Sequence, residues 1–189
     1  MQGHANGIVA ACTMSSNACT QLSANNTFTF MFVAMDKSGN CYADSIDASS
    51  GSPALWYWAG CSGSATEITT AQGFVESSFG GIDVDNAGNL VVLTLGSPST
   101  LTVYSGCSTG TCTLVTGPTP LVGAGNNECV YGHLGRFNGF YACGDYTAGQ
   151  VDVYSYGPTR IPVYKYSFNN GLSQSDVVEA ASYSPESKL

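Results

Sequence analysis

The sequence predicts an all-β protein assembled from repeated four-stranded units, and three observations support this prediction. One motif recurs at a spacing of 49 residues, the segments around it alternate apolar with polar side chains, and 23 glycines accompany a hydrophobic content of 43%. Alternation with a period of two is typical of a strand with one buried face. A unit of about four short strands in ~40–50 residues is the blade of a β-propeller.

The first repeated element is a strand, a tight turn and a second strand. Its copies lie at Val33–Asp44, at Ile82–Leu93, within Cys129–Cys143 and from Val178 onward. The turn aspartates Asp36 and Asp85 are 49 residues apart. Such an aspartate can accept a hydrogen bond from the backbone two residues later, and the glycine that follows supplies the positive φ that closes the hairpin. A calcium loop is the alternative for these turns, but the ligand array of a 12-residue calcium loop is missing.

A second element follows each copy of the first. It is a strand predicted at Ala54–Cys61, Leu101–Cys107 and Gln150–Gly157, with a relative at Gly7–Cys12. The two elements together predict blades of about 49 residues. In the best-defined blade the strands are expected near 81–85, 89–95, 100–106 and 112–116.

The whole chain, 1–189, is predicted to be one propeller domain or a fragment of one, with three full blades and a split terminal blade. The expected limits are 1–27 for the outer strands of a blade, 28–75, 76–124 and 125–175 for full blades, and 176–189 for the inner strand of a further blade. The two ends lack a strand between them, so we expect a partial chain, with a four-bladed ring or a two-chain ring as alternatives. Self-association through the incomplete blade ends follows as a prediction.

The segment Gly81–Val92 (GIDVDNAGNLVV), followed by Leu101–Tyr104, resembles an NHL-type repeat, and Tyr141–Tyr146 with Gln150–Tyr154 resembles its second half. The resemblance implies the six-bladed propeller superfamily, whose members include scaffolds, binding modules, lactonases and lyases. Two departures stand out. Leu134 occupies the place expected for a turn aspartate, and the repeat does not require the cysteines.

Eight cysteines form an even set, which predicts an oxidised, extracytoplasmic protein, secreted or exposed at a surface. The strand register narrows their pairing to Cys12–Cys19, Cys41–Cys61, Cys107–Cys112 and Cys129–Cys143. Each pair would join neighbouring strands of one blade. The alternatives are free thiols in a cytosolic protein, or metal ligation by Cys12/Cys19 and Cys107/Cys112. Zinc sites favour closer spacings and a second ligand pair, which disfavours the metal.

Charge limits the partners. With 13 acidic and five basic residues the net charge is -8, which excludes a nucleic-acid partner, because phosphate binding needs clustered Lys and Arg. The acidic membrane surface repels the chain for the same reason. No apolar run approaches the roughly 20 residues of a membrane span, so membrane insertion is not expected.

Propeller geometry would gather several carboxylates on one face of the ring. They are Glu76, Glu128 and Glu179 in connections between blades, and Asp44 and Asp145 at the ends of second strands. One interpretation is a solvated surface that keeps the protein in solution. The other is a ligand or calcium site at the axial mouth, of the kind that the resemblance to propeller lactonases implies.

Two further sets of residues are candidates. The repeat aligns His133 with Met35 and Val84, which predicts a packed histidine rather than a catalytic one. Trp56 and Trp58 share one face of a strand. Their role is either packing between blades or, if exposed, stacking on a sugar or a partner protein.

Taken together, these residues predict a secreted, NHL-like propeller that serves as a non-catalytic binding or assembly module for a protein or carbohydrate. The alternative is a calcium-dependent hydrolase or lactonase that uses the acidic mouth. Apart from calcium in that alternative, no cofactor is predicted, and no serine or cysteine nucleophile is supported.

Overall fold

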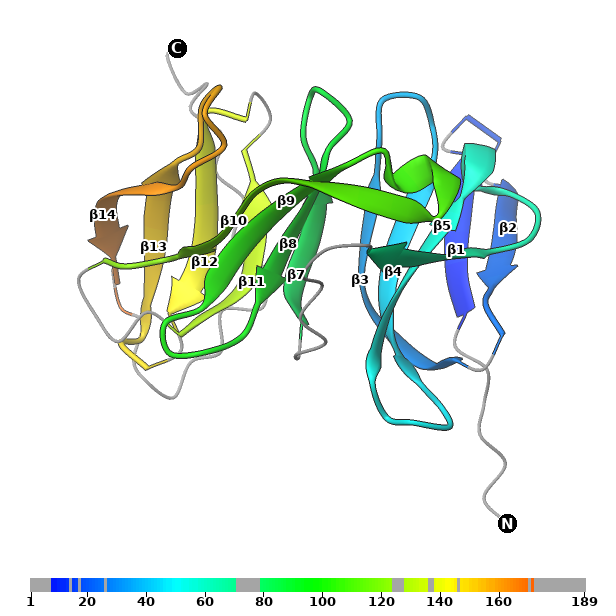
Figure 1. Cartoon of the computed structure of the whole chain (residues 1–189), viewed down its shortest axis with the longest axis horizontal. Helices are drawn as coiled ribbons and strands as arrows, with labels where there is room; N and C mark the ends of the chain where they lie inside the picture. Colours follow the sequence, from blue (N-terminus) through cyan, green and yellow to red (C-terminus); the bar gives the residue numbers. More distant parts are fainter. Residues whose placement is uncertain are drawn as a thin grey trace. The chain divides into compact units, whose positions relative to one another are not determined.

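The structure is a computed structural model that describes residues 8–13, 15–16, 18–25, 27–70, 79–123, 128–135, 138–145, 147–169 and 171. These residues fall into two compact units, one within Met1–Ser77 and Ser105–Thr113, the other within Ser78–Tyr104 and Leu114–Leu189. Fourteen strands and two short 3-10 turns make up the described part, in which no α-helix occurs. The all-β prediction is therefore confirmed (Figure 1).

The first unit begins with a hairpin of β1 (Ile8–Thr13) and β2 (Ala18–Ser23). An antiparallel run follows in chain order: β3 (Thr27–Met35), β4 (Cys41–Asp47), β5 (Pro53–Trp58) and β6 (Thr66–Thr70). The short turn η1 (Ala59–Cys61) links β5 to β6. Small and aromatic side chains, including Leu22, Ala43 and Trp58, form the buried core of this unit.

One parallel pairing also belongs to the first unit. After the turn η2 (Cys107–Thr109), the first residues of β10 (Thr111–Pro120) run parallel to the end of β6, with Thr111 opposite Thr69. The backbone N–H of Thr69 donates to the carbonyl oxygen of Gly110 at 2.7 Å. The edge of β6 is thus covered at this point.

The second unit holds two further antiparallel runs. The first is β7 (Phe79–Val84), β8 (Leu90–Thr94), β9 (Thr100–Ser105) and the rest of β10. The second is β11 (Cys129–Leu134), β12 (Phe140–Asp145), β13 (Gln150–Ser155) and β14 (Val163–Phe168), drawn from yellow to brown in Figure 1. Apolar residues such as Leu93, Val103 and Tyr141 fill the core between these strands.

Four consecutive antiparallel neighbours are the strand order of a propeller blade, and this order occurs three times, at β3–β6, β7–β10 and β11–β14. The chain is an all-β propeller. In the middle run the strands lie within two residues of the predicted starts. The number of blades in the ring and the limits of each remain predictions, and the inner strand expected at 176–189 lies outside the described residues.

The predicted turn chemistry is present. Oδ1 of Asp36 accepts the backbone N–H of Ser38 at 2.8 Å, and Oδ1 of Asp85 accepts that of Ala87 at 2.9 Å. The glycines in the same turns, Gly39 and Gly88, have φ of 81° and 82°. These aspartates therefore bind their own backbone, as the tight-turn interpretation requires.

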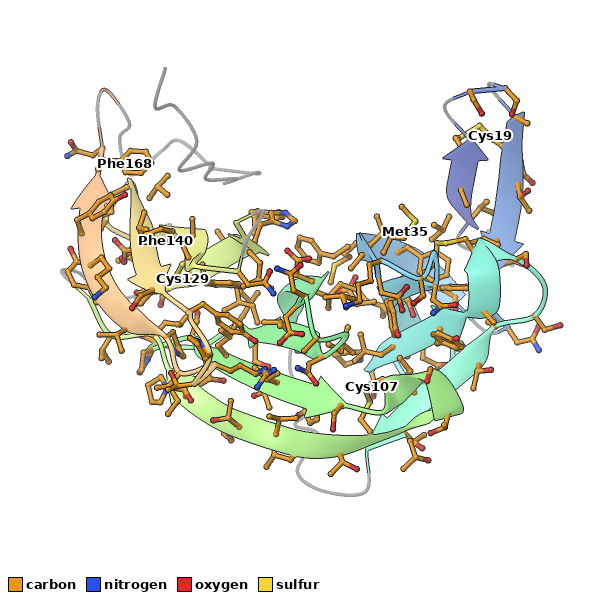
Figure 2. The ribbon with its side chains drawn as sticks, turned by 90° about the horizontal axis from the view of Figure 1, so that it is seen from above. Cys19, Met35, Cys107, Cys129, Phe140 and Phe168 are labelled. Carbon is orange, nitrogen blue, oxygen red and sulfur yellow. A yellow bond between two sulfur atoms is a disulfide. The ribbon has the colours of Figure 1, made fainter. Side chains whose placement is uncertain are left out.

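All four predicted disulfides are formed, and the described residues contain no free cysteine. Cys12 lies opposite Cys19 in the register of β1 and β2, and Figure 2 shows the bond near the end of this hairpin. Cys41–Cys61 joins β4 to η1, Cys107–Cys112 joins η2 to β10, and Cys129–Cys143 joins β11 to β12.

Candidate functional site

The predicted carboxylates are only partly brought together. Glu128 and Asp145 lie close to each other in the second unit, whereas Asp44 belongs to the first unit. Glu76 and Glu179 lie outside the described residues. In the described part of the chain the acidic group is therefore Glu128 with Asp145.

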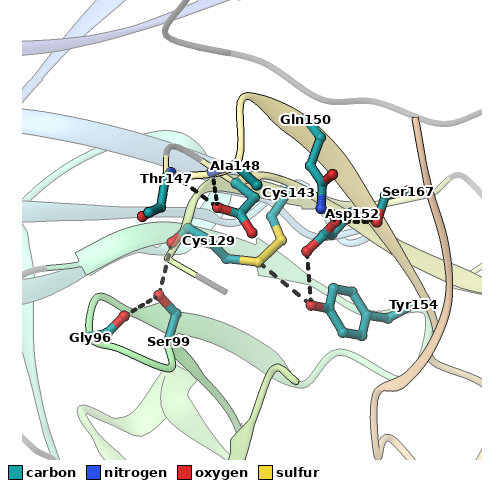
Figure 3. The surroundings of a disulfide bond; sticks show 11 residues. Gly96, Ser99, Cys129, Cys143, Thr147, Ala148, Gln150, Asp152, Tyr154 and Ser167 are labelled. Atoms are coloured by element: carbon teal, nitrogen blue, oxygen red, sulfur yellow. Dashed lines mark hydrogen bonds between the residues drawn. A yellow bond between two sulfur atoms is a disulfide. The ribbon is translucent and has the colours of Figure 1, made fainter. Parts of the chain in front are cut away.

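Asp145 ends β12, and its side chain is buried. Its Oδ1 accepts the backbone N–H groups of Thr147 at 3.0 Å and Ala148 at 2.9 Å, which fixes the turn into β13 (Figure 3). The hydroxyl of Thr147 donates to Oε2 of Glu128 at 2.8 Å. Glu128 is thus tied to the same turn by one side-chain bond.

A second buried carboxylate, Asp152 on β13, lies on the same face of the sheet and was missed by the sequence analysis. Its Oδ1 accepts the amide of Gln150 at 2.8 Å and the hydroxyl of Ser167 at 2.5 Å, and the Tyr154 hydroxyl donates to Oδ2 at 3.4 Å (Figure 3). Burial raises the pKa of Asp152 and, together with the negative charge of Asp145, outweighs these hydrogen bonds.

The residues around Asp152 form a dense polar network beside the Cys129–Cys143 disulfide. Asp152 lies opposite Cys143 in the register of β12 and β13, and the Tyr154 hydroxyl is 4.0 Å from Sγ of Cys129. Burial, followed by the charge of Asp152, raises the pKa of Tyr154. The tyrosine is therefore a hydrogen-bond donor here, and the network holds three strands together. The sequence feature that could have predicted this network is the alternation of Gln150, Asp152 and Tyr154 along one strand.

Asp44 on β4 is fully buried and accepts a hydrogen bond from the backbone of β3. The pairing of β3 with β4 shifts between Phe30 and Val33, and Oδ1 of Asp44 accepts the backbone N–H of Phe32 at 2.5 Å inside this bulge. Its Oδ2 has no hydrogen-bond partner among the described residues. Burial raises the pKa of Asp44 to about 7, despite the backbone N–H groups that lower it.

Trp56 and Trp58 are both buried, at 7% and 0% exposure. Nε1 of Trp56 donates to Oγ of the buried Ser45 at 2.8 Å, and the ring of Trp58 meets that of Phe30 edge-on. They pack in the core of the first unit together with Ala43 and Ala54. The exposed stacking pair considered for these residues is corrected to core packing, because neither ring is open to a ligand.

The alignment of His133 also needs correction. Leu134 pairs with Tyr141 as the last residue of its strand before the turn, just as Val84 pairs with Leu90, so Leu134, not His133, is equivalent to Val84. Gly135 then takes the place of the turn aspartate that had been assigned to Leu134. His133 is instead equivalent to Asp83, the residue before Val84.

Asp83 on β7 and His133 on β11, at equivalent positions of the two strands, lie close together. Nδ1 of His133 lies 3.7 Å from Oδ2 of Asp83, and both side chains are partly exposed. The same Oδ2 accepts the backbone N–H of Leu134 at 2.9 Å, and Oδ1 accepts that of Val84 at 2.8 Å. Asp83 therefore holds the two strands together through the backbone.

Asp85 and Arg160 form a second link within the unit. Nε of Arg160 donates to Oδ2 of Asp85 at 2.8 Å, and the Tyr156 hydroxyl donates to the same oxygen at 3.4 Å. Burial acts to raise the pKa of Asp85, but hydrogen bonds from Asn89, Arg160 and Ala87 outweigh it and lower that pKa. In the equivalent turn of the first unit, the Tyr42 hydroxyl contacts Asp36, and no arginine of the described part of the chain does so.

Among the residues that the structure describes, no group of three His, Cys, Asp or Glu side chains has the arrangement of a metal site. Nor does any helix within that part have the length and apolarity to cross a membrane.

No protein-family model matches the chain, and no curated protein matches it at the level of sequence. Solved structures do match. A protein from Lactobacillus plantarum shares 14% identity over 85% of this chain with a TM-score of 0.54, and hydrazine synthase of Kuenenia stuttgartiensis shares 9% over 82% with a TM-score of 0.53. The Dos1 propeller shares 15% over 87% with a TM-score of 0.45.

At such identities the likeness concerns the fold alone. The chain spans about half the length of the first two structures, with 48% and 47% of them covered. The fold class is therefore established, and the activity has to be argued from the residues of this chain.

Proposed function

We propose that this chain is part of a secreted or surface-exposed, NHL-like propeller that binds a protein or carbohydrate partner without transforming it. The observation that carries this proposal is how the buried carboxylates are used. Asp44, Asp85 and Asp145 each accept backbone N–H groups of their own unit. A general acid or base needs a carboxylate that faces substrate, and these three face their own chain.

Extracytoplasmic location is supported by the cysteines. Four disulfides lie within single hairpins or adjacent elements, and such bonds persist in oxidising compartments. They stabilise strands that are individually marginal in a chain rich in glycine and serine. This use of cysteine fits a protein that works outside the cytosol.

The proposal includes assembly with further chain, because one blade-like element is incomplete in the described part. The β1–β2 hairpin forms a two-stranded sheet of its own there, whereas a blade has about four strands. Sedimentation velocity over a range of concentrations tests self-association, and we expect a concentration-dependent species heavier than the 19.6 kDa chain. A single monomeric species at all concentrations would remove the assembly part of the proposal.

Binding is separated from hydrolysis by two measurements on the same preparation. The protein is applied to immobilised glycans and peptides, and it is incubated with a panel of aryl esters and lactones with and without millimolar calcium. We expect capture by one ligand class and no turnover above buffer. Calcium-dependent turnover, together with a calcium-dependent rise in Tm that Glu128→Gln abolishes, would overturn the proposal in favour of the hydrolase.

A further inference from the structure

The second unit contains a surface hollow of about 350 Å³ where three loops meet. Its walls are Asp85 and Ala87 from the turn after β7, Asn138 and Gly139 from the loop before β12, and Gly157 and Arg160 from the loop after β13. This volume is at the lower end of the range for small-molecule sites. It suits a ligand the size of a single sugar ring.

Arg160 is held at this hollow with most of its hydrogen-bonding capacity unused. Its Nε donates to Asp85, a side chain that also accepts two backbone N–H groups and the amide of Asn89. Neither Nη group of Arg160 meets an acceptor in the described part of the chain. The guanidinium is thus oriented by a buried carboxylate while its two outer nitrogens remain available to a ligand.

Asn138 supplies a second unused group. Its backbone N–H and C=O are engaged with Gly135 and Gly157, whereas its carboxamide has no partner among the described residues. Asn138 and Arg160 have φ of 54° and 56°, in the left-handed region that few residues other than glycine adopt. Backbone of this kind is concentrated at binding sites, where the surrounding structure holds it in place.

The guanidinium of Arg160 and the carboxamide of Asn138 determine which class of ligand fits the hollow. A guanidinium offers parallel N–H donors that match the two oxygens of a carboxylate. A carboxamide both donates and accepts, which suits a hydroxyl. Asp85 balances the charge of Arg160 and the whole chain carries -8, so a polyanion is disfavoured and a single carboxylate is not.

We propose that this hollow binds a hydroxylated carboxylate, the chemistry of a uronic acid unit in an acidic saccharide. Arg160 pairs with the carboxylate and Asn138 with a ring hydroxyl. The inference rests on the proposed binding function and narrows it to one site and one ligand class.

The test is a titration of the isotope-labelled full chain, followed in ¹H–¹⁵N spectra including the arginine side-chain resonances. The probes are D-glucuronate, D-glucose and acetate. We expect glucuronate to bind with a millimolar Kd and to shift Arg160 Nε and the amides of Asn138 and Gly139, with both control probes at least about tenfold weaker.

Two variants and one control complete the experiment. Arg160→Gln should weaken glucuronate binding by about tenfold or more, because a charge-assisted pair is lost. Asn138→Gly keeps the left-handed backbone and should weaken it about threefold, even if Arg160→Gln proves poorly folded. Lys37→Gln removes an equal charge in the other unit and should leave the Kd unchanged.

Absence of shifts at the hollow with glucuronate would overturn the site, as would an Arg160→Gln variant that is folded and binds equally well. Acetate binding as tight as glucuronate would overturn the saccharide assignment. If the protein is captured on a glycan or peptide array but glucuronate shifts no resonance at the hollow, this site is rejected and the proposed binding function is kept. If neither the array nor the titration detects binding, both this site and the proposed binding function are rejected.

Discussion

A Cβ atom placed on Gly81 would lie 2.8 Å from the carbonyl oxygen of Gly132, so β7 and β11 meet backbone to backbone at these two glycines. A Cβ atom placed on Gly132 would in turn overlap the hydroxyl of Tyr141, a fully buried side chain whose pKa is raised well above 10 by burial and then by the charge of Asp83. The contact between the two runs of strands therefore leaves no room for a methyl group.

The first prediction is that Gly132→Ala destabilises the protein by about 1–3 kcal/mol, because the new Cβ overlaps the hydroxyl of the buried Tyr141. Urea unfolding followed by circular dichroism measures the change. Gly139→Ala is the matched control, since nothing lies within 4 Å of its Cβ position, and it should change stability little. Equal stability of the two variants would contradict the close approach.

The second prediction concerns pH and Asp44. Its folded pKa of about 7 lies above the ordinary value of 3.8, so the folded state binds the proton more tightly than the unfolded chain does. The stability that this group contributes is fully present below pH ~4 and is lost as pH rises through 7, on the order of 4 kcal/mol in all.

Asp44→Asn should remove this dependence, because the amide oxygen can still accept the N–H of Phe32 and no charge is buried. We expect the variant to match the wild type near pH 4 and to exceed its free energy of unfolding at pH 8. Parallel pH profiles of the two proteins would show the idea to be wrong.

The third prediction compares Asp85→Asn with Asp36→Asn. Both substitutions keep a side-chain oxygen in the same type of turn, but only Asp85 bonds an arginine. We expect Asp85→Asn to cost about 1–2 kcal/mol more than Asp36→Asn, as for hydrogen bonds to charged groups. Because the pKa of Asp85 is lowered, its contribution is present at neutral pH and fades as pH falls through that pKa. The difference between the variants should shrink in acid.

The fourth prediction ranks two disulfides. The half-cystines of Cys41–Cys61 are 20 residues apart in sequence and those of Cys107–Cys112 are five apart. Chain-entropy arguments give about 3 kcal/mol for the first and about 2 kcal/mol for the second. Paired substitution by serine, followed by calorimetry, should lower Tm more for Cys41/Cys61. The opposite order would mean that contacts in the folded state outweigh loop closure.

A fifth prediction follows from the two tryptophans of the chain, Trp56 and Trp58. Since both are buried, emission should be blue-shifted from that of free tryptophan and resist quenching by acrylamide. Adding saccharides or peptides should leave the emission unchanged. Strong quenching in the native state would restore the exposed stacking pair.

The sequence predicted strands and cysteine pairs well because both depend on local spacing. Cys12 and Cys19 flank one short turn, and the period of two places them opposite each other. The alignment failed at His133 because Leu134 follows Val84 by 50 residues, one more than the period of 49 that the repeat predicted. The bulge in β11 does not account for the offset, since β7 has a bulge as well. The proximity of Asp83 and His133 was therefore not expected.

The repeat pattern predicts neither which side chains are buried nor which residues far apart in the sequence come into contact. The alternation at Trp56 and Trp58 is the same whether the face is covered or open, so the neighbouring β1–β2 hairpin and the bulky Phe30 decided their role. Arg160 meets Asp85 across 75 residues, from a loop in which both Gly157 and Arg160 are left-handed. Neither feature has a signature in residue spacing.

The edge of β14 that pairs with no described strand also affects how the protein behaves at high concentration. Val163, Tyr166 and Phe168 are exposed on this strand at 41–53%, a combination that invites strands of other molecules to add on and precipitate. Lys165 lies among them, and a lysine in an edge strand deters such addition by charge repulsion. We therefore expect Lys165 to limit aggregation through this edge, and it should be retained when the surface of this chain is engineered.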